Sequence, residues 1–148
     1  MKKFVAFIGI FIFTFGFSFA QSEILQSQIN LDKKEAAKQG FSLIDEGSVQ
    51  TTYDWALSFD PEDYYSGYLY LIVIYLEGCS SCDLTLYFHD YNNGEVEYLS
   101  PQIKRSGGLV QAVYHVKQTI TSKGQLAAYA KSEVNVFTYG MLFRKSSY

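Results

Sequence analysis

The segment 68–76 constrains this chain more than any other part of its sequence. It reads Tyr-Leu-Tyr-Leu-Ile-Val-Ile-Tyr-Leu, so both sets of alternate positions are apolar or aromatic. Such residues favour strands, and a strand that is apolar on both faces lies in the centre of a sheet, where both faces are buried. Gly67 and Gly78 bound the segment. The sequence therefore predicts a central strand.

Several other segments have strand character. The segment 83–90 alternates so that one face is apolar, and the Asn93-Gly94 pair that follows favours a tight hairpin turn. The chain then returns through Val96 and Tyr98. The remaining predicted strands are 41–47 (a short strand or turn), 50–59, 109–117, 125–131 and 135–144.

A helix precedes these strands. Residues 22–39 carry apolar side chains at three- and four-residue steps, and Gly40 stands where a left-handed residue would end a helix. We therefore expect a helical extension at 21–40 and one β domain at 41–148. Short strands separated by Gly, Asn and Ser turns predict a mainly β fold, an antiparallel β-sandwich or jelly roll of about seven to eight strands.

The first twenty residues have the pattern of a secretory signal peptide. Lys2 and Lys3 precede an apolar run at 4–19, and small residues precede a predicted cut between Ala20 and Gln21. The competing interpretation is a retained membrane anchor, but sixteen residues fall short of the roughly twenty that span a bilayer. We expect cleavage, an exported protein in the periplasm or outside the cell, and no stable membrane span after cleavage.

Composition narrows the function classes. The whole chain has a formal charge of -3, and loss of the two lysines leaves 10 basic and 15 acidic residues, or -5, which argues against nucleic-acid binding. The sequence has no nucleophile elbow, phosphate-binding glycine loop or His-Glu-x-x-His motif, so we expect neither enzymatic activity nor a cofactor. Its 13 tyrosines suit cross-strand pairs in a sheet, with a carbohydrate-stacking platform as the alternative.

Cys79 and Cys82 form a Cys-x-x-Cys motif with two interpretations. A thiol–disulfide exchange centre relies on a following helix whose N-terminus stabilises the thiolate. Here a strand pattern headed by Asp83 follows, and a carboxylate beside a thiol raises its pKa. A structural disulfide in an oxidising compartment is the favoured interpretation.

Metal binding has little support in the sequence. His89 and His115 stand alone, without partners at ligand spacing. Asp60, Glu62 and Asp63 form an acidic loop that would hold calcium weakly, while a solvated turn explains the same residues.

The order of these motifs resembles the bacterial pre-peptidase C-terminal domains and related exported β-sandwich modules. The residues concerned are the strand 68–76, the loop Cys79–Cys82, the Asp83-Leu-x-Leu strand and the Asn-Gly turn, within 53–144. The resemblance implies a non-catalytic accessory or binding module, and some relatives bind calcium through such acids, which adds Asp83 to the candidates. Ser81 stands where the family often has a second Asp, and this weakens a metal site.

The sequence therefore predicts an exported, non-catalytic β-sandwich that binds a protein or glycan partner. Two alternatives stay open. One is a periplasmic redox protein that uses Cys79 and Cys82, and the other is a structural envelope or matrix component that associates through exposed strands.

Overall fold

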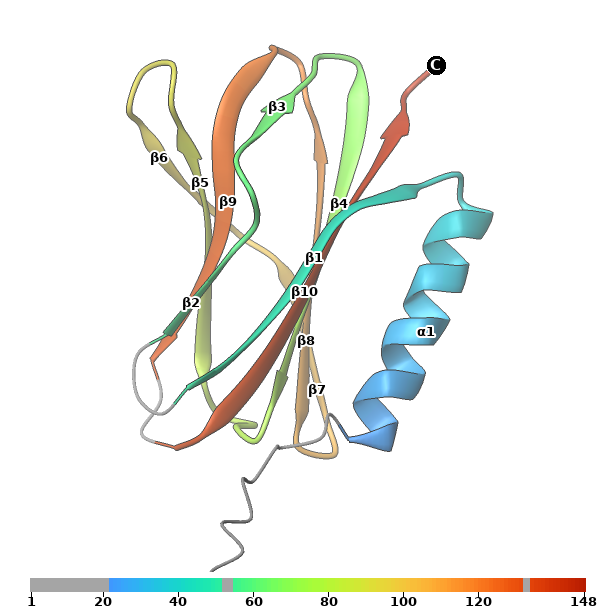
Figure 1. Ribbon diagram of the computed structural model, residues 1–148, viewed down its shortest axis with the longest axis vertical. Helices are drawn as coiled ribbons and strands as arrows, with labels where there is room; N and C mark the ends of the chain where they lie inside the picture. The colour runs from blue at the N-terminus through green and yellow to red at the C-terminus, as the bar shows by residue number, and fades with distance from the viewer. Residues whose placement is uncertain (1–21, 52–54, 132–133) are drawn as a thin grey trace, which may run out of the picture.

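The computed structural model describes residues 22–51, 55–131 and 134–148, and it shows two antiparallel sheets with one helix outside them (Figure 1). The first sheet has the order β1-β10-β4-β8-β7, and the second has the order β2-β9-β5-β6 with β3 also paired to β9. The elements are α1 (Glu23–Lys38), β1 (Ser42–Thr51), β2 (Trp55–Ser58), β3 (Glu62–Tyr64), β4 (Tyr68–Glu77), β5 (Asp83–Asp90), β6 (Val96–Leu99), β7 (Gln102–Ser106), β8 (Leu109–Lys117), β9 (Ser122–Lys131) and β10 (Val136–Ser146).

The fold is a β-sandwich, as the sequence predicts, and β4 is the middle strand of the first sheet. Residues 70–76 of β4 are all buried. Its inward side chains, Tyr70, Ile72, Ile74 and Leu76, pack against the second sheet. Its outward side chains, Leu71, Val73 and Tyr75, form a second core with α1. The molecule consequently has three layers: helix, sheet and sheet.

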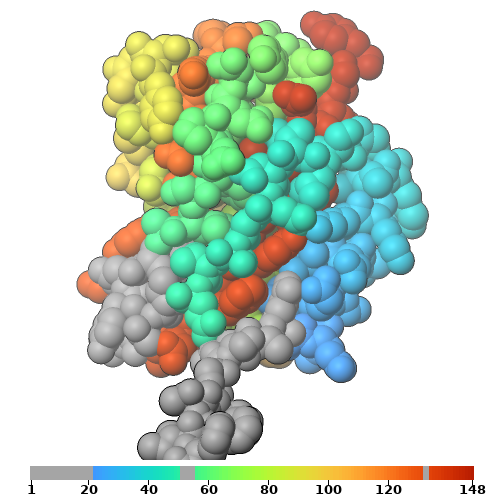
Figure 2. All heavy atoms as spheres, in the orientation of Figure 1, coloured from blue at the N-terminus to red at the C-terminus, as the bar shows by residue number. Residues whose placement is uncertain are grey.

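Helix α1 lies along the outer face of the first sheet, beside β1 and β10 (Figure 2). The Ser22 hydroxyl caps its N-terminus by accepting a hydrogen bond from the Leu25 N–H at 3.2 Å. Leu25, Ile29 and Ala36 are its buried residues. Gly40 follows with a φ of 83°, the left-handed conformation expected of a residue just beyond a helix.

A cluster of polar side chains between α1 and the first sheet binds the hydroxyl group of Tyr75, which lies in the otherwise apolar core beneath the helix. Tyr75 is fully buried, and its hydroxyl donates a hydrogen bond to Asp32 of α1. The Gln111 amide of β8 donates to Asp32 Oδ2 at 2.6 Å and to the Tyr75 hydroxyl at 3.1 Å, and the Gln28 amide donates to Asp32 Oδ1 at 3.1 Å. Hydrogen bonds thus join α1, β4 and β8. Each polar side chain of the cluster has a hydrogen-bond partner, as polar groups buried in a core require.

Three details differ from the sequence prediction. The structure has ten strands rather than seven to eight. The predicted strand 50–59 is wrong as a single element, because β1 ends at Thr51 in the first sheet while β2 starts at Trp55 in the second. The short strands β3 and β7 were not predicted. Strand β7 has the sequence Gln-Ile-Lys-Arg-Ser, in which no apolar residues alternate, and all five of its residues are exposed. A strand without apolar alternation gives no sequence signal.

The predicted signal peptide, with its cut between Ala20 and Gln21, lies outside the described residues. Within the described part of the chain, no helix combines the length and apolar character needed to cross a membrane.

We predict that Ile29→Ala weakens the docking of the helix, whereas Ile24→Ala does not. Ile29 is 1% exposed in the helix–sheet core, and its truncation should lower the free energy of unfolding by about 2–4 kcal/mol. Ile24 lies on the same helix but is 70% exposed, so its truncation should change stability by less than about 0.5 kcal/mol. Urea denaturation followed by circular dichroism measures both, and equal effects would contradict the docking described here.

Candidate functional site

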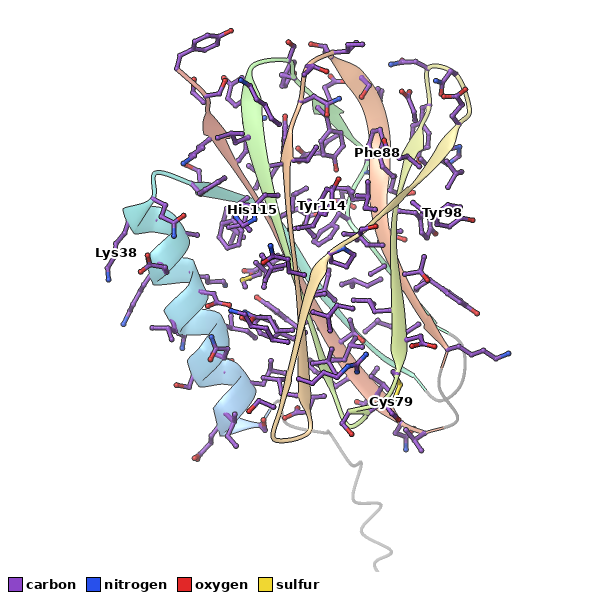
Figure 3. The ribbon with its side chains drawn as sticks, turned by 180° about the vertical axis from the view of Figure 1, so that it is seen from behind. Lys38, Cys79, Phe88, Tyr98, Tyr114 and His115 are labelled. Carbon is purple, nitrogen blue, oxygen red and sulfur yellow. A yellow bond between two sulfur atoms is a disulfide. The ribbon has the colours of Figure 1, made fainter. Side chains whose placement is uncertain are left out.

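The outer face of the second sheet carries aromatic side chains that the core does not use. Along β5, Leu86 and Phe88 join the core, which turns Tyr87 to the opposite face. Tyr98 of β6 is directly opposite Tyr87 in the strand register. Figure 3 shows Tyr98 pointing away from the sandwich and Phe88 pointing between the sheets. We call this surface the tyrosine face, and it comprises Tyr87, His89, Tyr91, Val96, Tyr98 and Tyr129.

The centre of the tyrosine face is the Tyr87–Tyr98 pair. Their ring centroids lie 6.5 Å apart with planes tilted by 58°, a geometry within the range of favourable aromatic contacts. The register fixes this pair, but Tyr98 remains 73% exposed. Val96, two residues earlier on the same strand, is 47% exposed. The sheet therefore presents a ring and an aliphatic side chain to solvent.

Polar groups border the two rings. The His89 ring meets the Tyr91 ring edge to face at 4.9 Å, and the Tyr91 hydroxyl donates a hydrogen bond to the Gln125 side chain at 3.0 Å. His89, Tyr91 and Gln125 supply hydrogen-bonding groups beside an apolar surface. This combination of flat rings and neighbouring donors and acceptors suits recognition of a partner that is itself partly apolar and partly polar.

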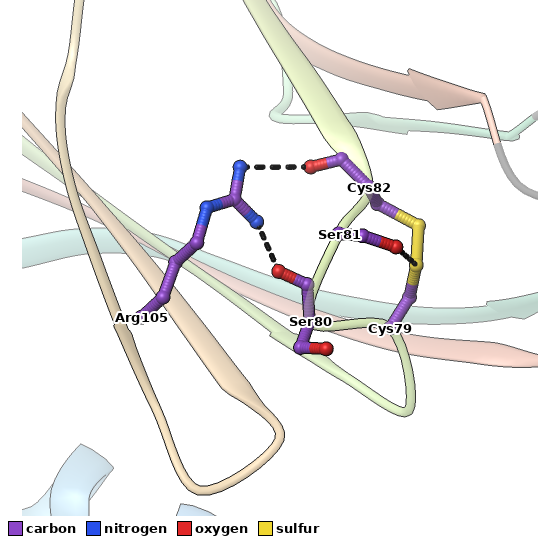
Figure 4. The surroundings of a disulfide bond; sticks show 5 residues. All are labelled: Cys79, Ser80, Ser81, Cys82 and Arg105. Atoms are coloured by element: carbon purple, nitrogen blue, oxygen red, sulfur yellow. Dashed lines mark hydrogen bonds between the residues drawn. A yellow bond between two sulfur atoms is a disulfide. The ribbon is translucent and has the colours of Figure 1, made fainter.

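The two cysteines lie in the loop between β4 and β5, which crosses from the first sheet to the second. Cys79 and Cys82 form a disulfide, which both interpretations of the motif allow. Arg105 of β7 donates hydrogen bonds to the carbonyl oxygens of Ser80 at 2.5 Å and Cys82 at 3.1 Å (Figure 4). The guanidinium thus holds the backbone of the loop against the first sheet.

The local structure around the disulfide differs from that of an exchange centre with a helix-stabilised thiolate. Cys82 is 4% exposed and leads directly into β5, a strand. The Cys79 sulfur lies 4.0 Å from the Ser81 hydroxyl. No helix begins at the loop, so the helix N-terminus that such a centre uses is replaced here by a strand and an arginine that contacts carbonyl groups.

The four acidic residues considered for calcium do not lie together. Glu62 and Asp63 belong to β3, where Glu62 is in register with Gly124, and Gly124 in turn pairs with Asp90 at the end of β5. Asp83 begins β5 at its opposite end, in register with Lys131. Asp60 uses its backbone N–H to bond the Asp45 carboxylate at 2.7 Å. In the described residues no three acidic, histidine or cysteine side chains gather as metal ligands would.

The two histidines occupy different surfaces. His89 belongs to the tyrosine face, and His115 lies on the outer face of β8, where it lines a groove of about 310 Å³ between β8 and α1. Asp32 and Gln111 also line this groove, and they are already bonded to each other and to Tyr75. The groove is consequently the rim of the helix docking site.

No family model, no curated protein and no solved structure matches this chain. The resemblance to the pre-peptidase C-terminal domains therefore stays a prediction from the sequence.

We predict that loss of the disulfide costs only about 2 kcal/mol, because it closes a very short loop and constrains the unfolded chain little. Cys79→Ala/Cys82→Ala should lower the free energy of unfolding by this amount and keep the far-ultraviolet circular dichroism spectrum. Wild-type protein unfolded in the presence of dithiothreitol is the matched control and should show the same loss. Collapse of the fold in either sample would contradict a merely local cross-link.

Proposed function

We propose that this chain is an exported, non-catalytic binding module that recognises a protein or a glycan through its tyrosine face. The observation that supports the proposal is the exposure of Tyr98, at 73%, beside Tyr87 on a regular sheet. A large ring left in water on an edge strand contributes little to the core. Contiguous exposed apolar groups with a polar border are typical of interaction surfaces.

Both partner classes suit the chemistry of this face. A sugar ring offers C–H groups to a tyrosine ring and hydroxyl groups to His89 and Gln125. A protein surface offers apolar side chains to the same ring, and tyrosine is enriched in binding hot spots. The face extends over three neighbouring strands, β9, β5 and β6, and so offers enough surface for an extended glycan chain or a protein partner.

The redox alternative receives less support from the geometry. The disulfide loop is followed by a strand, and Arg105, the cation that contacts the loop, bonds carbonyl oxygens. An insulin-reduction assay tests it directly: activity that disappears in Cys79→Ser would favour redox function over the binding module. A structural envelope component would self-associate through exposed strands, which size-exclusion chromatography at high protein concentration would reveal.

We predict that a photocrosslinking residue, p-benzoylphenylalanine, placed at Tyr98 captures a partner from an extract of the cell envelope. The same residue placed at Leu31, which is 58% exposed on the helix, is the matched control and should capture nothing. Digestion of the crosslinked product with protease or with glycan-cleaving enzymes identifies the partner class. Capture at Leu31 but not at Tyr98 would contradict the proposal.

A second measurement separates binding from folding. Tyr87→Ala/Tyr98→Ala should reduce envelope binding by at least about tenfold, the typical cost of truncating a hot-spot pair. Leu31→Ala should leave binding unchanged. Both variants should unfold within about 1 kcal/mol of the wild type, because the substituted side chains lie outside the core.

A further inference from the structure

Strand β8 has an unpaired edge at its C-terminal half. β7 pairs with β8 only from Leu109 to Val113, so residues 114–117 have β4 on one side and no strand on the other among the described residues. Gln118 donates its N–H to Tyr68 and accepts from Gly67, which places its backbone groups on the β4 side. Because backbone groups alternate along an antiparallel strand, His115 and Lys117 direct theirs to the open edge.

A cleft opens beside this edge, between the two sheets. Its volume is about 370 Å³, and we call it the edge cleft. One wall is β8 and the loop after it, and the other wall is β5, β6 and their connecting turn. In Figure 3, Phe88 and Tyr114 are seen between the sheets at this level. Its lining residues include Phe88, Asp90, Glu95, Glu97, Val116 and Lys117.

The edge cleft is acidic. Asp90, Glu95 and Glu97 line it, and Lys117, at the end of β8, is the one basic residue among its lining residues. The carboxylates of Asp90 and Glu95 accept hydrogen bonds from the turn, but the Glu97 carboxylate has no hydrogen-bond or ion-pair partner in the described part of the chain. Burial, and then the nearby charge of Glu97, raise the pKa of Tyr114 on β8.

An apolar recess of about 40 Å³ adjoins the edge cleft and shares Phe88, Glu97 and Val116 with it. Tyr64 lines this recess at 3% exposure, with its ring 5.0 Å from that of Phe88. Burial raises the pKa of Tyr64, and a hydrogen bond with the backbone of Leu126 opposes this effect.

We propose that the edge cleft binds an extended segment of a partner protein that adds to β8 as an antiparallel strand, as β7 does further along this edge, and that carries lysine or arginine. His115 and Lys117 supply the backbone hydrogen bonds, as in other cases of strand addition. Alternate side chains of the added strand point into the cleft, where basic groups meet Asp90, Glu95 and Glu97. This site is separate from the tyrosine face, because Glu97 and Tyr98 lie on opposite faces of β6, and either proposal can fail alone.

The register makes a sharp test possible. His115 and Lys117 have outward side chains, and a residue hydrogen-bonded opposite them also points its side chain outward. In a bound peptide of alternating lysine and threonine, with lysines in the cleft, only the threonine N–H groups face β8. N-methylation of the threonines should therefore prevent pairing, whereas N-methylation of the lysines should not.

The experiment titrates the ¹⁵N-labelled protein with a blocked Lys-Thr hexapeptide and follows amide signals by NMR. We expect shifts at 114–118 and 96–99, weaker binding at high salt, and about tenfold weaker binding when the threonines are N-methylated. The lysine-methylated isomer should bind like the parent peptide. Glu97→Gln should weaken binding about fivefold, whereas Asp83→Asn, an equal charge change at the far end of β5, should not.

Three outcomes would overturn the proposal. The first is no shift at these amides at millimolar peptide. The second is equal binding of both N-methylated isomers, or of a Glu-Thr hexapeptide, because strand addition and charge would then play no part. The third is a change of the 114–118 amides with protein concentration alone, which would show that a second copy of this chain occupies the edge.

Discussion

The double-sided burial of β4 is the constraint on which the rest of the structure depends. A strand whose residues 70–76 are all buried needs a cover on each side, and the chain supplies a second sheet for one side and α1 for the other. The covers fit closely. A Cβ on Gly140 of the neighbouring strand β10 would lie 2.5 Å from a methyl carbon of Leu57 in β2, so a larger residue there would displace core side chains.

The parts of this fold that the sequence predicts are those with a strong local period. The two-sided segment 68–76, the alternation at 83–90 and 109–117, and the helix before Gly40 all match the structure closely. Prediction fails where the period carries no information about pairing. The segment 50–59 alternates without interruption, although the chain passes from the first sheet to the second between Thr51 and Trp55. The exposed strand β7 has no apolar pattern at all.

The candidate sites divide in the same way. That Tyr87 faces away from the core follows from the alternation of β5, and the Asn-Gly turn brings β6 back beside it. The pairing of Tyr87 with Tyr98, in contrast, needs the register, which one sequence does not determine. The edge cleft is further from prediction, since it exists because β7 stops pairing at Val113 and leaves the end of β8 open to the second sheet.

The pairing of β1 with β10 has a consequence for the order in which this molecule assembles. The ribosome produces α1 and β1 first, yet the strand that pairs with β1 and helps to cover α1, β10, is produced last. Register partners such as Ser42 and Arg144 are separated by nearly the whole domain, and contacts of such long range form slowly. Until β10 is produced, β1 and β4 lack the strand that joins them, and α1 lacks its contacts with Met141 and Phe143. The unfinished chain therefore exposes apolar surface and unpaired strand edges, which favour aggregation.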